Sequence, residues 1–273
     1  MRLKKYITLL RAGIIESMQF RLSMLITVIC NLLYLLLIYH LWKAIYASSD
    51  TDIVNGMTFS DTMVYLVFAS ALFSFMEMWI VWNMGRDIQS GKIVVDLLKP
   101  MKYRTWLFFM GSGEIVVKFF STFLPTAVIV YFVSKGAIPL GVNLLWFTGS
   151  VICSLLINYY INFMVGIICM YTESIWGVNI MKEVIIGLLS GATIPLAFFP
   201  AVLKKAAMAL PFQAICNSPM ELLLHDEYTI LEFAKVLGIQ IFWLVALGMI
   251  SNWFFQISLK RITVNGASCI IQI

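Results

Sequence analysis

Polar side chains recur at every fourth position inside one of the longest apolar runs of the chain. Ser154, Asn158 and Asn162 are spaced so that they lie on one face of a helix. A second apolar run carries the carboxylate of Glu77. Amide and carboxylate groups within a bilayer need polar partners, which are either water in a cavity or groups on other helices. Asn158, Asn162 and Glu77 therefore predict either the lining of a substrate pathway or hydrogen bonds between helices, and the sequence leaves both open.

Residue types that carry catalysis or bind metals are sparse. The two histidines, His40 and His225, lie at the edges of apolar runs and are not spaced as a ligand pair. A Gly-Ser-Gly sequence at 111–113 resembles part of a nucleophile motif but lacks a histidine partner. The chain has no H-E-x-x-H motif, no phosphate-binding loop, and no C-x-x-C pair among its five cysteines. We therefore expect no catalytic site, no metal site and no bound cofactor, so that any ATP must be bound by another chain.

Long apolar runs must position these polar groups. The composition is 61% hydrophobic and only 12% charged, and about 20 apolar residues suffice to cross a bilayer as a helix. The sequence predicts an all-α, polytopic membrane protein that forms a single transmembrane domain over residues 1–273. Its six predicted spans are Leu22–Trp42, Thr62–Met84, Phe119–Ser134, Asn143–Met170, Val184–Leu203 and Phe233–Ile257.

Lysine and arginine alternate with the spans. They gather before the first span, between spans two and three, and after the last: Arg2, Lys4, Lys5, Arg11, Arg21; Arg86, Lys92, Lys99, Lys102, Arg104; Lys260, Arg261. The loop over residues 47–61 has neither residue type and carries three aspartates. Because positive residues mark the cytoplasmic side, both termini are predicted to be cytoplasmic. The net charge of +5 is then a topology signal, and no nucleic-acid partner is expected.

Two further segments flank the spans. Residues 1–20 carry an apolar stripe with basic flanks, which is typical of a helix lying in the membrane interface. Residues 190–219 are apolar but hold four of the seven prolines, which predicts a re-entrant helical hairpin before the last span, with its non-helical joints held against protein or water. Within it, Phe198 and Phe199 lie between Pro195 and Pro200, where they either plug the outer end of a pathway or serve as ordinary packing residues.

The charged loop over residues 85–104 has a helix-like, apolar middle that ends at Pro100. Leu97 and Leu98 are exposed there unless a partner covers them. Lys92, Asp96 and Lys99 are expected to surround that contact with charge and fix its register. Beyond the loop, residues 105–118 contain polar insertions, among them the glutamate and lysine of a helical i, i+4 pair at positions 114 and 118.

These features together resemble the permease subunit of a bacterial type-2 ATP-binding-cassette (ABC) exporter. The most specific part is the run S-G-K-x-x-x-D-L-L-K-P over residues 90–100. The resemblance implies that this loop is a coupling helix docking into a separate cytosolic ATPase that holds ATP and Mg²⁺. It also implies that residues 1–20 form a connecting helix, that the hairpin closes the outer end of the pathway, and that two six-span subunits face each other in the bacterial cytoplasmic membrane.

Two other classes remain as alternatives. An ATP-independent channel or secondary carrier predicts strong intramembrane charge and two matching broken helices. An integral-membrane enzyme requires an acid, base or metal cluster that the sequence does not assemble. Neither the cargo nor the identity of the second permease, identical or paralogous, is determined by the sequence.

Overall fold

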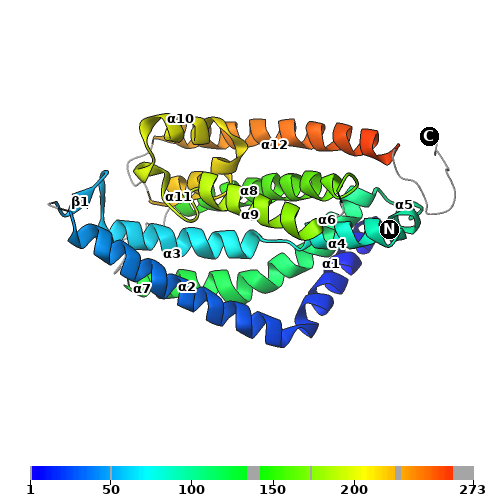
Figure 1. The fold of residues 1–273 in the computed structure, drawn as a ribbon, viewed down its shortest axis with the longest axis horizontal. Helices are drawn as coiled ribbons and strands as arrows, with labels where there is room; N and C mark the ends of the chain where they lie inside the picture. The colour runs from blue at the N-terminus through cyan, green and yellow to red at the C-terminus, as the bar shows by residue number, and fades with distance from the viewer. Residues whose placement is uncertain (1, 50, 134–141, 173, 225–228, 261–273) are drawn as a thin grey trace.

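The computed structural model is mostly helical, which confirms the all-α fold class (Figure 1). It describes residues 2–49, 51–133, 142–172, 174–224 and 229–260. His225, Arg261 and Ser134 therefore lie outside the described residues. In the described ranges, the strands are β1 (Ile53–Val54) and β2 (Met57–Thr58), paired as an antiparallel hairpin.

The helices follow in this order: α1 (Arg2–Gln19), α2 (Arg21–Ala47), α3 (Phe59–Met76), α4 (Ile80–Gln89), α5 (Lys92–Leu97), α6 (Tyr103–Lys118), π-helical η1 (Phe119–Phe123), α7 (Leu124–Val133), α8 (Val142–Ile168), α9 (Ile175–Leu189), 3₁₀-helical η2 (Leu196–Phe198), α10 (Ala201–Ala209), 3₁₀-helical η3 (Pro211–Ala214), α11 (Asn217–Leu224) and α12 (Ile230–Leu259). The long helices α2, α3, α8 and α12 run along the long axis of the molecule (Figure 1). Helices α1, α4 and α5 gather at one end, and the β-hairpin and α10 lie toward the other.

Among the described residues, five helical segments are long and apolar enough to cross a membrane. They are Leu22–Ala47, Phe59–Gln89, Tyr103–Phe132, Asn143–Ile168 and Ile230–Leu259. The third corrects the prediction of a span that begins at Phe119, because the polar segment over residues 105–118 belongs to the same helix. Its polar groups are satisfied locally: Ser112 Oγ donates to the Phe108 carbonyl oxygen at 2.7 Å, and Lys118 lies 2.9 Å from Glu114.

The predicted span Val184–Leu203, which the sequence expects to be interrupted by Pro195 and Pro200, is not one continuous helix. Helix α9 begins earlier, where Ser174 Oγ accepts from the Gly177 N–H at its start, and ends before Gly191. Gly191 has a φ of +81°, a left-handed conformation that glycine adopts without a Cβ clash, and it turns the chain into the hairpin. With 15 residues, α9 is shorter than the roughly 20 needed to cross a bilayer. The count of six spans therefore stays a prediction.

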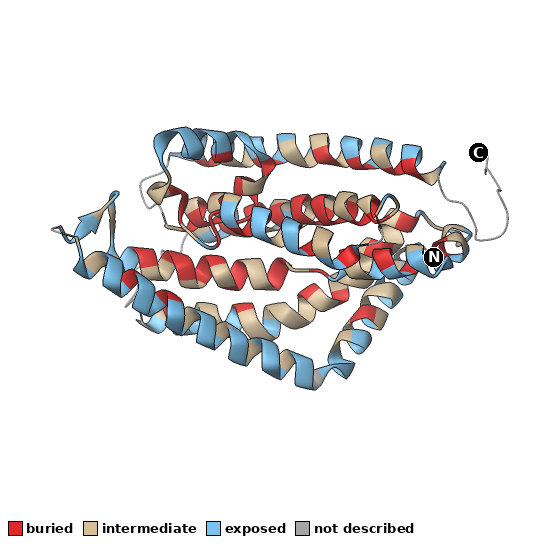
Figure 2. Cartoon of the chain, viewed as in Figure 1, coloured by how far each residue is buried: buried red, intermediate tan, exposed pale blue. Residues whose placement is uncertain are grey.

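The most deeply buried side chains lie on α3 and α8. Leu66, Leu72 and Met76 of α3 and Ile157 and Phe163 of α8 are fully buried, and burial is concentrated along these central helices (Figure 2). By contrast, only 6% of the apolar window of α2 is buried. Helices that are apolar on all sides and exposed are typical of membrane spans, because lipid covers them.

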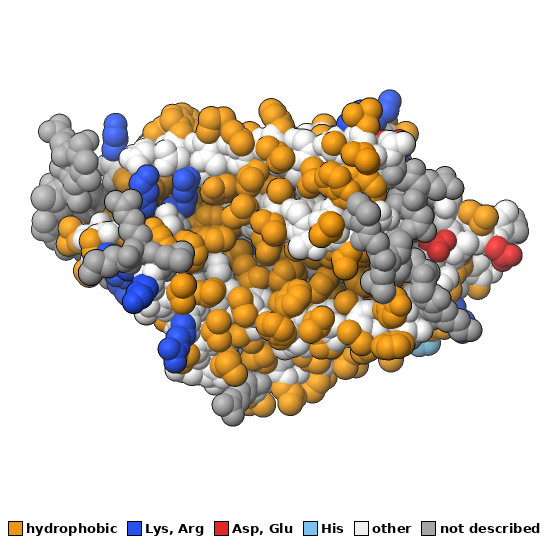
Figure 3. All heavy atoms as spheres, turned by 180° about the vertical axis from the view of Figure 1, so that it is seen from behind, with side chains coloured by type: hydrophobic (Ala, Val, Ile, Leu, Met, Phe, Trp, Pro, Cys, Tyr) orange, Lys and Arg blue, Asp and Glu red, His pale blue; other side chains and the backbone are white. Residues whose placement is uncertain are grey.

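Charged side chains lie toward the two ends of the face shown in Figure 3. Hydrophobic side chains cover the middle of the face shown, lysine and arginine gather at one end, and the acidic groups lie toward the other. That other end includes the exposed Asp52 of the β-hairpin region, and α10 adds Lys204 and Lys205 there. The exposed apolar middle has the form expected of a surface that faces lipid.

Helix α1 packs along α6, with Tyr6 stacked on Phe109 at a ring-centroid distance of 4.6 Å. Its other face exposes Ile7, Ile15 and Met18, each at least half accessible. An apolar face left open beside basic residues is the arrangement expected of a helix in the membrane interface. That location for residues 1–20 stays a prediction.

Candidate transport site and coupling segment

The second span is broken at Glu77. Helix α3 ends at Met76, Glu77 is extended (φ −66°, ψ 126°), and α4 begins at Ile80. The sequence predicted one continuous run, Thr62–Met84. A break within a membrane leaves backbone groups without their helical partners, and each must be satisfied from elsewhere in the protein or by water.

Three side chains from other helices satisfy the groups at the break. Asn158 Nδ2 of α8 donates to the Met76 carbonyl oxygen at 2.8 Å. Lys118 Nζ of α6 donates to the Glu77 carbonyl oxygen at 3.0 Å. Glu114 Oε2 of α6 accepts from the Trp79 N–H at 3.3 Å. The break is therefore held in place by α8 on one side and by α6 on the other.

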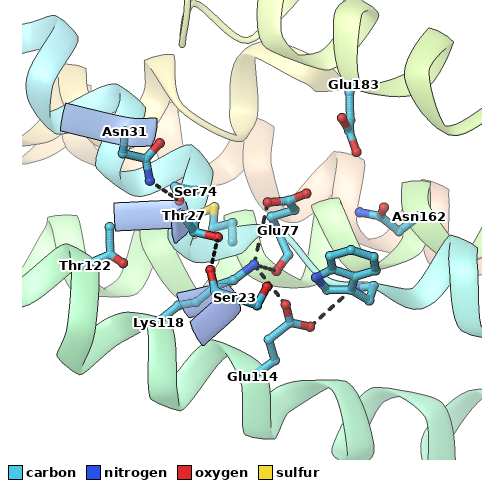
Figure 4. A network of polar contacts seen from close by, with 12 residues as sticks. Ser23, Thr27, Asn31, Ser74, Glu77, Glu114, Lys118, Thr122, Asn162 and Glu183 are labelled. Carbon is cyan, nitrogen blue, oxygen red and sulfur yellow. Dashed lines mark hydrogen bonds and ion pairs between the residues drawn. The ribbon is translucent and has the colours of Figure 1, made fainter. Parts of the chain in front are cut away.

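Glu77, Glu114 and Lys118 form an ion triad (Figure 4). Lys118 Nζ lies 2.9 Å from Glu114 Oε1 and 3.6 Å from Glu77 Oε2. The π-helical turn η1 follows Lys118 directly. Such turns widen a helix locally and are frequent at functional sites. A broken helix and a π-helical turn thus face each other across a group of charges.

A polar row on α2 faces the same region and is absent from the sequence predictions. Asn31 Nδ2 donates to Ser74 Oγ of α3 at 3.3 Å, and Thr27 Oγ1 donates to the Ser23 carbonyl oxygen at 2.9 Å (Figure 4). Ser23, Thr27 and Asn31 are four residues apart, the spacing that singled out Ser154, Asn158 and Asn162. The same search applied to the first span would have found them.

These groups border a cavity of about 1100 Å³ between α1, α2, α4 and α6. The cavity extends from Asp87 and Lys92, beside the charged loop, to Ser121 and Thr122 in the π-helical turn. Glu77 and the other two members of the triad line its wall. The cavity therefore connects the basic end of the molecule with the interior of the spans.

The asparagine row does not line this cavity. Asn158 and Asn162 are buried, and Asn162 Nδ2 donates to the Asn158 carbonyl oxygen at 2.8 Å. Lys182 Nζ of α9 donates to Asn162 Oδ1 at 2.9 Å, and Ser154 Oγ donates to the Ala214 carbonyl oxygen at 2.7 Å. These bonds favour the interhelical interpretation. Lys182 was missed because the predicted span began at Val184, which placed this lysine outside the membrane.

The predicted coupling segment begins after Gly91, whose φ of +73° marks the turn between α4 and α5. Lys92 Nζ lies 3.2 Å from Asp87 Oδ1 and stays exposed. Asp96 is buried instead and pairs with Lys99 at 2.7 Å, which corrects its predicted place among the surrounding charges. Lys99 Nζ also lies 3.8 Å from the centroid of the Trp106 ring, a cation–π contact that ties the segment to α6.

The two leucines of the segment differ. Leu97 is partly buried and packs on the core, whereas Leu98 is 81% exposed. Val95, three residues earlier, is 63% exposed and Ile93 is buried. Pro100 is exposed and follows the last turn. The outward apolar surface of this segment, here called the α5 knob, therefore consists of Val95 and Leu98.

The proline-rich hairpin packs at the opposite end. Pro195 is buried, Phe199 is half-buried and Pro200 is exposed at the start of α10. The Phe198 ring meets Trp42 of α2 edge-on, with centroids 4.6 Å apart. On the return leg, the Ala214 carbonyl oxygen accepts from Gln240 Nε2 of α12 at 2.8 Å. The hairpin is thus attached to the first, fourth and last spans.

In the described ranges, no group of three or more His, Cys, Asp or Glu is placed to hold a metal ion. Residues 32–266 match the family model described as "ABC-2 family transporter protein". The chain belongs to the ABC-2 transporter family. No curated protein matches the chain significantly. The ABC-2 protein is thus a membrane-spanning permease subunit of an ABC transporter, which associates with an ABC ATPase and with the membrane.

Family membership also bears on the alternatives. The described part of the permease does contain one broken helix with charges, as a secondary carrier would. The family match nevertheless assigns the permease to the ABC transporters. An ATP-independent channel and an integral-membrane enzyme gain no support from the comparison.

Proposed function

We propose that this permease forms half of the translocation pathway of a bacterial ABC exporter and docks a separate ATPase through the α5 knob. The observation that carries the proposal is the exposure of Val95 and Leu98 on a segment whose other side chains are fixed to the protein. An apolar pair held rigidly at the surface is suited to a groove on a partner. ATP and Mg²⁺ are then bound by the partner chain, and this chain binds no cofactor.

Coupling follows from chain continuity. Helix α5 continues from α4 through one turn at Gly91, and α4 begins at the break beside the cavity. A displacement of α5 by the ATPase is therefore transmitted to the cavity wall over a single short helix. Rigid movement of one element against others is a common way to convert a partner's closure into a change of site.

Substrate is proposed to enter the cavity from the basic, cytoplasmic end and to leave past the hairpin. Phe198 and Phe199, between Pro195 and Pro200, are placed to close the outer end. Both termini are then cytoplasmic, in a bacterial inner membrane. A second permease, identical or paralogous, would cover the exposed α2 and complete the pathway by two-fold pairing.

Replacing Leu98 with Asp tests the docking surface. Burying one leucine stabilises a contact by roughly 1.5–3 kcal/mol, and a carboxylate there adds a desolvation cost. We expect Leu98→Asp together with Val95→Asp to abolish retention of the ATPase in pull-downs and to stop transport, while the permease still inserts. The matched control is Val202→Asp on α10, because Val202 is 83% exposed at the opposite end. Native retention of the ATPase by the double variant would refute docking through α5.

A further inference from the structure

The cavity wall carries an unbalanced negative charge within the spans. Glu77 and Glu114 share one cation, Lys118, so the triad has one more carboxylate than ammonium. The side chains are partly shielded: Glu114 is 17% exposed and Lys118 16%, whereas Glu77 is 42% exposed and faces the cavity. An excess carboxylate in a partly shielded cavity attracts a group of opposite sign.

The other charges of the cavity do not supply that partner. Lys92 lies at the cavity's outer end and pairs with Asp87 at 3.2 Å. Arg86 Nη2 donates to Asn83 Oδ1 at 2.6 Å and stays exposed. Glu16, also exposed, adds a further carboxylate at the α1 side of the wall. Over all lining residues the carboxylates again outnumber the cations by one.

Apolar and aromatic side chains also line the wall beside the triad. Trp79 is 51% exposed and lines the cavity next to the carboxylates. Met24 of α2, Val117 of α6 and Phe20, which lies between α1 and α2, also line it. An exposed indole face attracts a cation as well as apolar carbon. By contrast, the Trp106 ring already has Lys99 over its face.

We propose that this cavity binds an amphipathic organic monocation as the transported ligand. Its positive group contacts the carboxylates of Glu77 and Glu114 beside Lys118, and its apolar body lies against Trp79 and the apolar side chains of α2. The hydroxyl groups of Ser23 and Thr27 offer polar contacts along the same wall. This inference rests on the proposed transport function. It specifies that the ligand is positively charged. Neither the family nor the cavity's size implies that charge, because an apolar cavity alone accepts neutral and anionic molecules equally.

The test uses the purified permease alone, in detergent, with two ions of equal shape and opposite charge. Tetraphenylphosphonium should bind saturably at one site per chain, and tetraphenylborate should not. Glu77→Gln should weaken tetraphenylphosphonium binding at least tenfold, and Glu114→Gln should do the same. Glu183→Gln is the matched control, because Glu183 also lies beside a lysine, at 3.7 Å, yet does not line the cavity.

Lys118→Gln provides a test of opposite sign. Removing the shared ammonium leaves two carboxylates without a fixed cation, so tetraphenylphosphonium should bind more tightly, provided that thermal unfolding shows an intact fold. Equal binding of the two ions, or unchanged affinity in both glutamate variants, would overturn the proposal and leave the carboxylates only the role of holding Lys118. The binding assay contains no ATPase, so its result does not depend on docking through α5. Docking is measured separately, by the pull-down with Leu98→Asp.

Discussion

Gly13 of α1 and Gly113 of α6 meet backbone to backbone where the N-terminal helix crosses the third span. A Cβ atom at Gly113 would overlap the carbonyl carbon of Gly13 and the nitrogen of Ile14, and one at Gly13 would overlap the Met110 carbonyl oxygen. Small residues at a helix crossing allow this close approach. The crossing fixes α1 against the wall of the cavity, since Gly13 and Met110 both line it.

Gly113→Val should therefore separate α1 from α6. Overpacking costs roughly 1–3 kcal/mol in ordinary cores, and a clash with backbone has no flexible side chain to yield, so we expect a loss at the upper end of that range. Thermal unfolding of the detergent-purified permease measures it. The control is Gly149→Ala on α8, which has open space around its Cβ position. It should be neutral or stabilising by up to about 1 kcal/mol; an equal loss in both variants would count against the crossing.

Orientation in the membrane can be read from accessibility. In a cysteine-free background, single cysteines at Thr51 and at Lys92 lie at opposite ends of the molecule and are exposed. Since lysine and arginine mark the cytoplasmic side, a membrane-impermeant maleimide added to intact cells should label position 51 only. Labelling of position 92 but not 51 would invert the topology.

The hairpin plug can be tested through Phe198 and Phe199. Because Phe198 packs edge-on against Trp42, its loss removes an aromatic contact of about 0.5–1.5 kcal/mol along with apolar packing. Replacing both phenylalanines with Ala should increase the leak of a small dye from proteoliposomes and raise basal ATP hydrolysis, without preventing assembly. Val202→Ala, exposed on the adjacent α10, serves as the comparison. Unchanged leak and hydrolysis would reduce the pair to packing residues.

Asn158→Leu should destabilise the broken span. The substitution removes the donor to the Met76 carbonyl oxygen and also Asn158 Oδ1, which accepts from Asn162 Nδ2. A buried acceptor without a donor costs about 1–3 kcal/mol. Thermal unfolding and chymotrypsin cleavage at Trp79 report the loss. Thr148→Val, which removes an exposed bond within α8, should leave both unchanged; equal effects would show that Asn158 does not hold the break.

The apolar runs by themselves determined most of the fold. Five of the predicted spans correspond to helices of suitable length, because a bilayer imposes a minimum apolar length that is visible in any window of sequence. The exposed apolar side chains that make residues 85–104 the predicted coupling segment were also conspicuous in the sequence, because they stand in a charged loop. The α5 helix ends at Leu97, three residues before Pro100.

The site itself was decided by tertiary structure. Hydropathy over Thr62–Met84 gives no sign of the break at Glu77, because the residues that stabilise it, Asn158 and Lys118, lie 82 and 41 positions away in the chain. Likewise, Leu97 and Leu98 are neighbouring residues of the same type, so the sequence does not distinguish them. Only the packing of the segment buries Leu97 partly and leaves Leu98 exposed. Local composition reports which segments enter the membrane, whereas the partners of a buried polar group depend on which helices become neighbours.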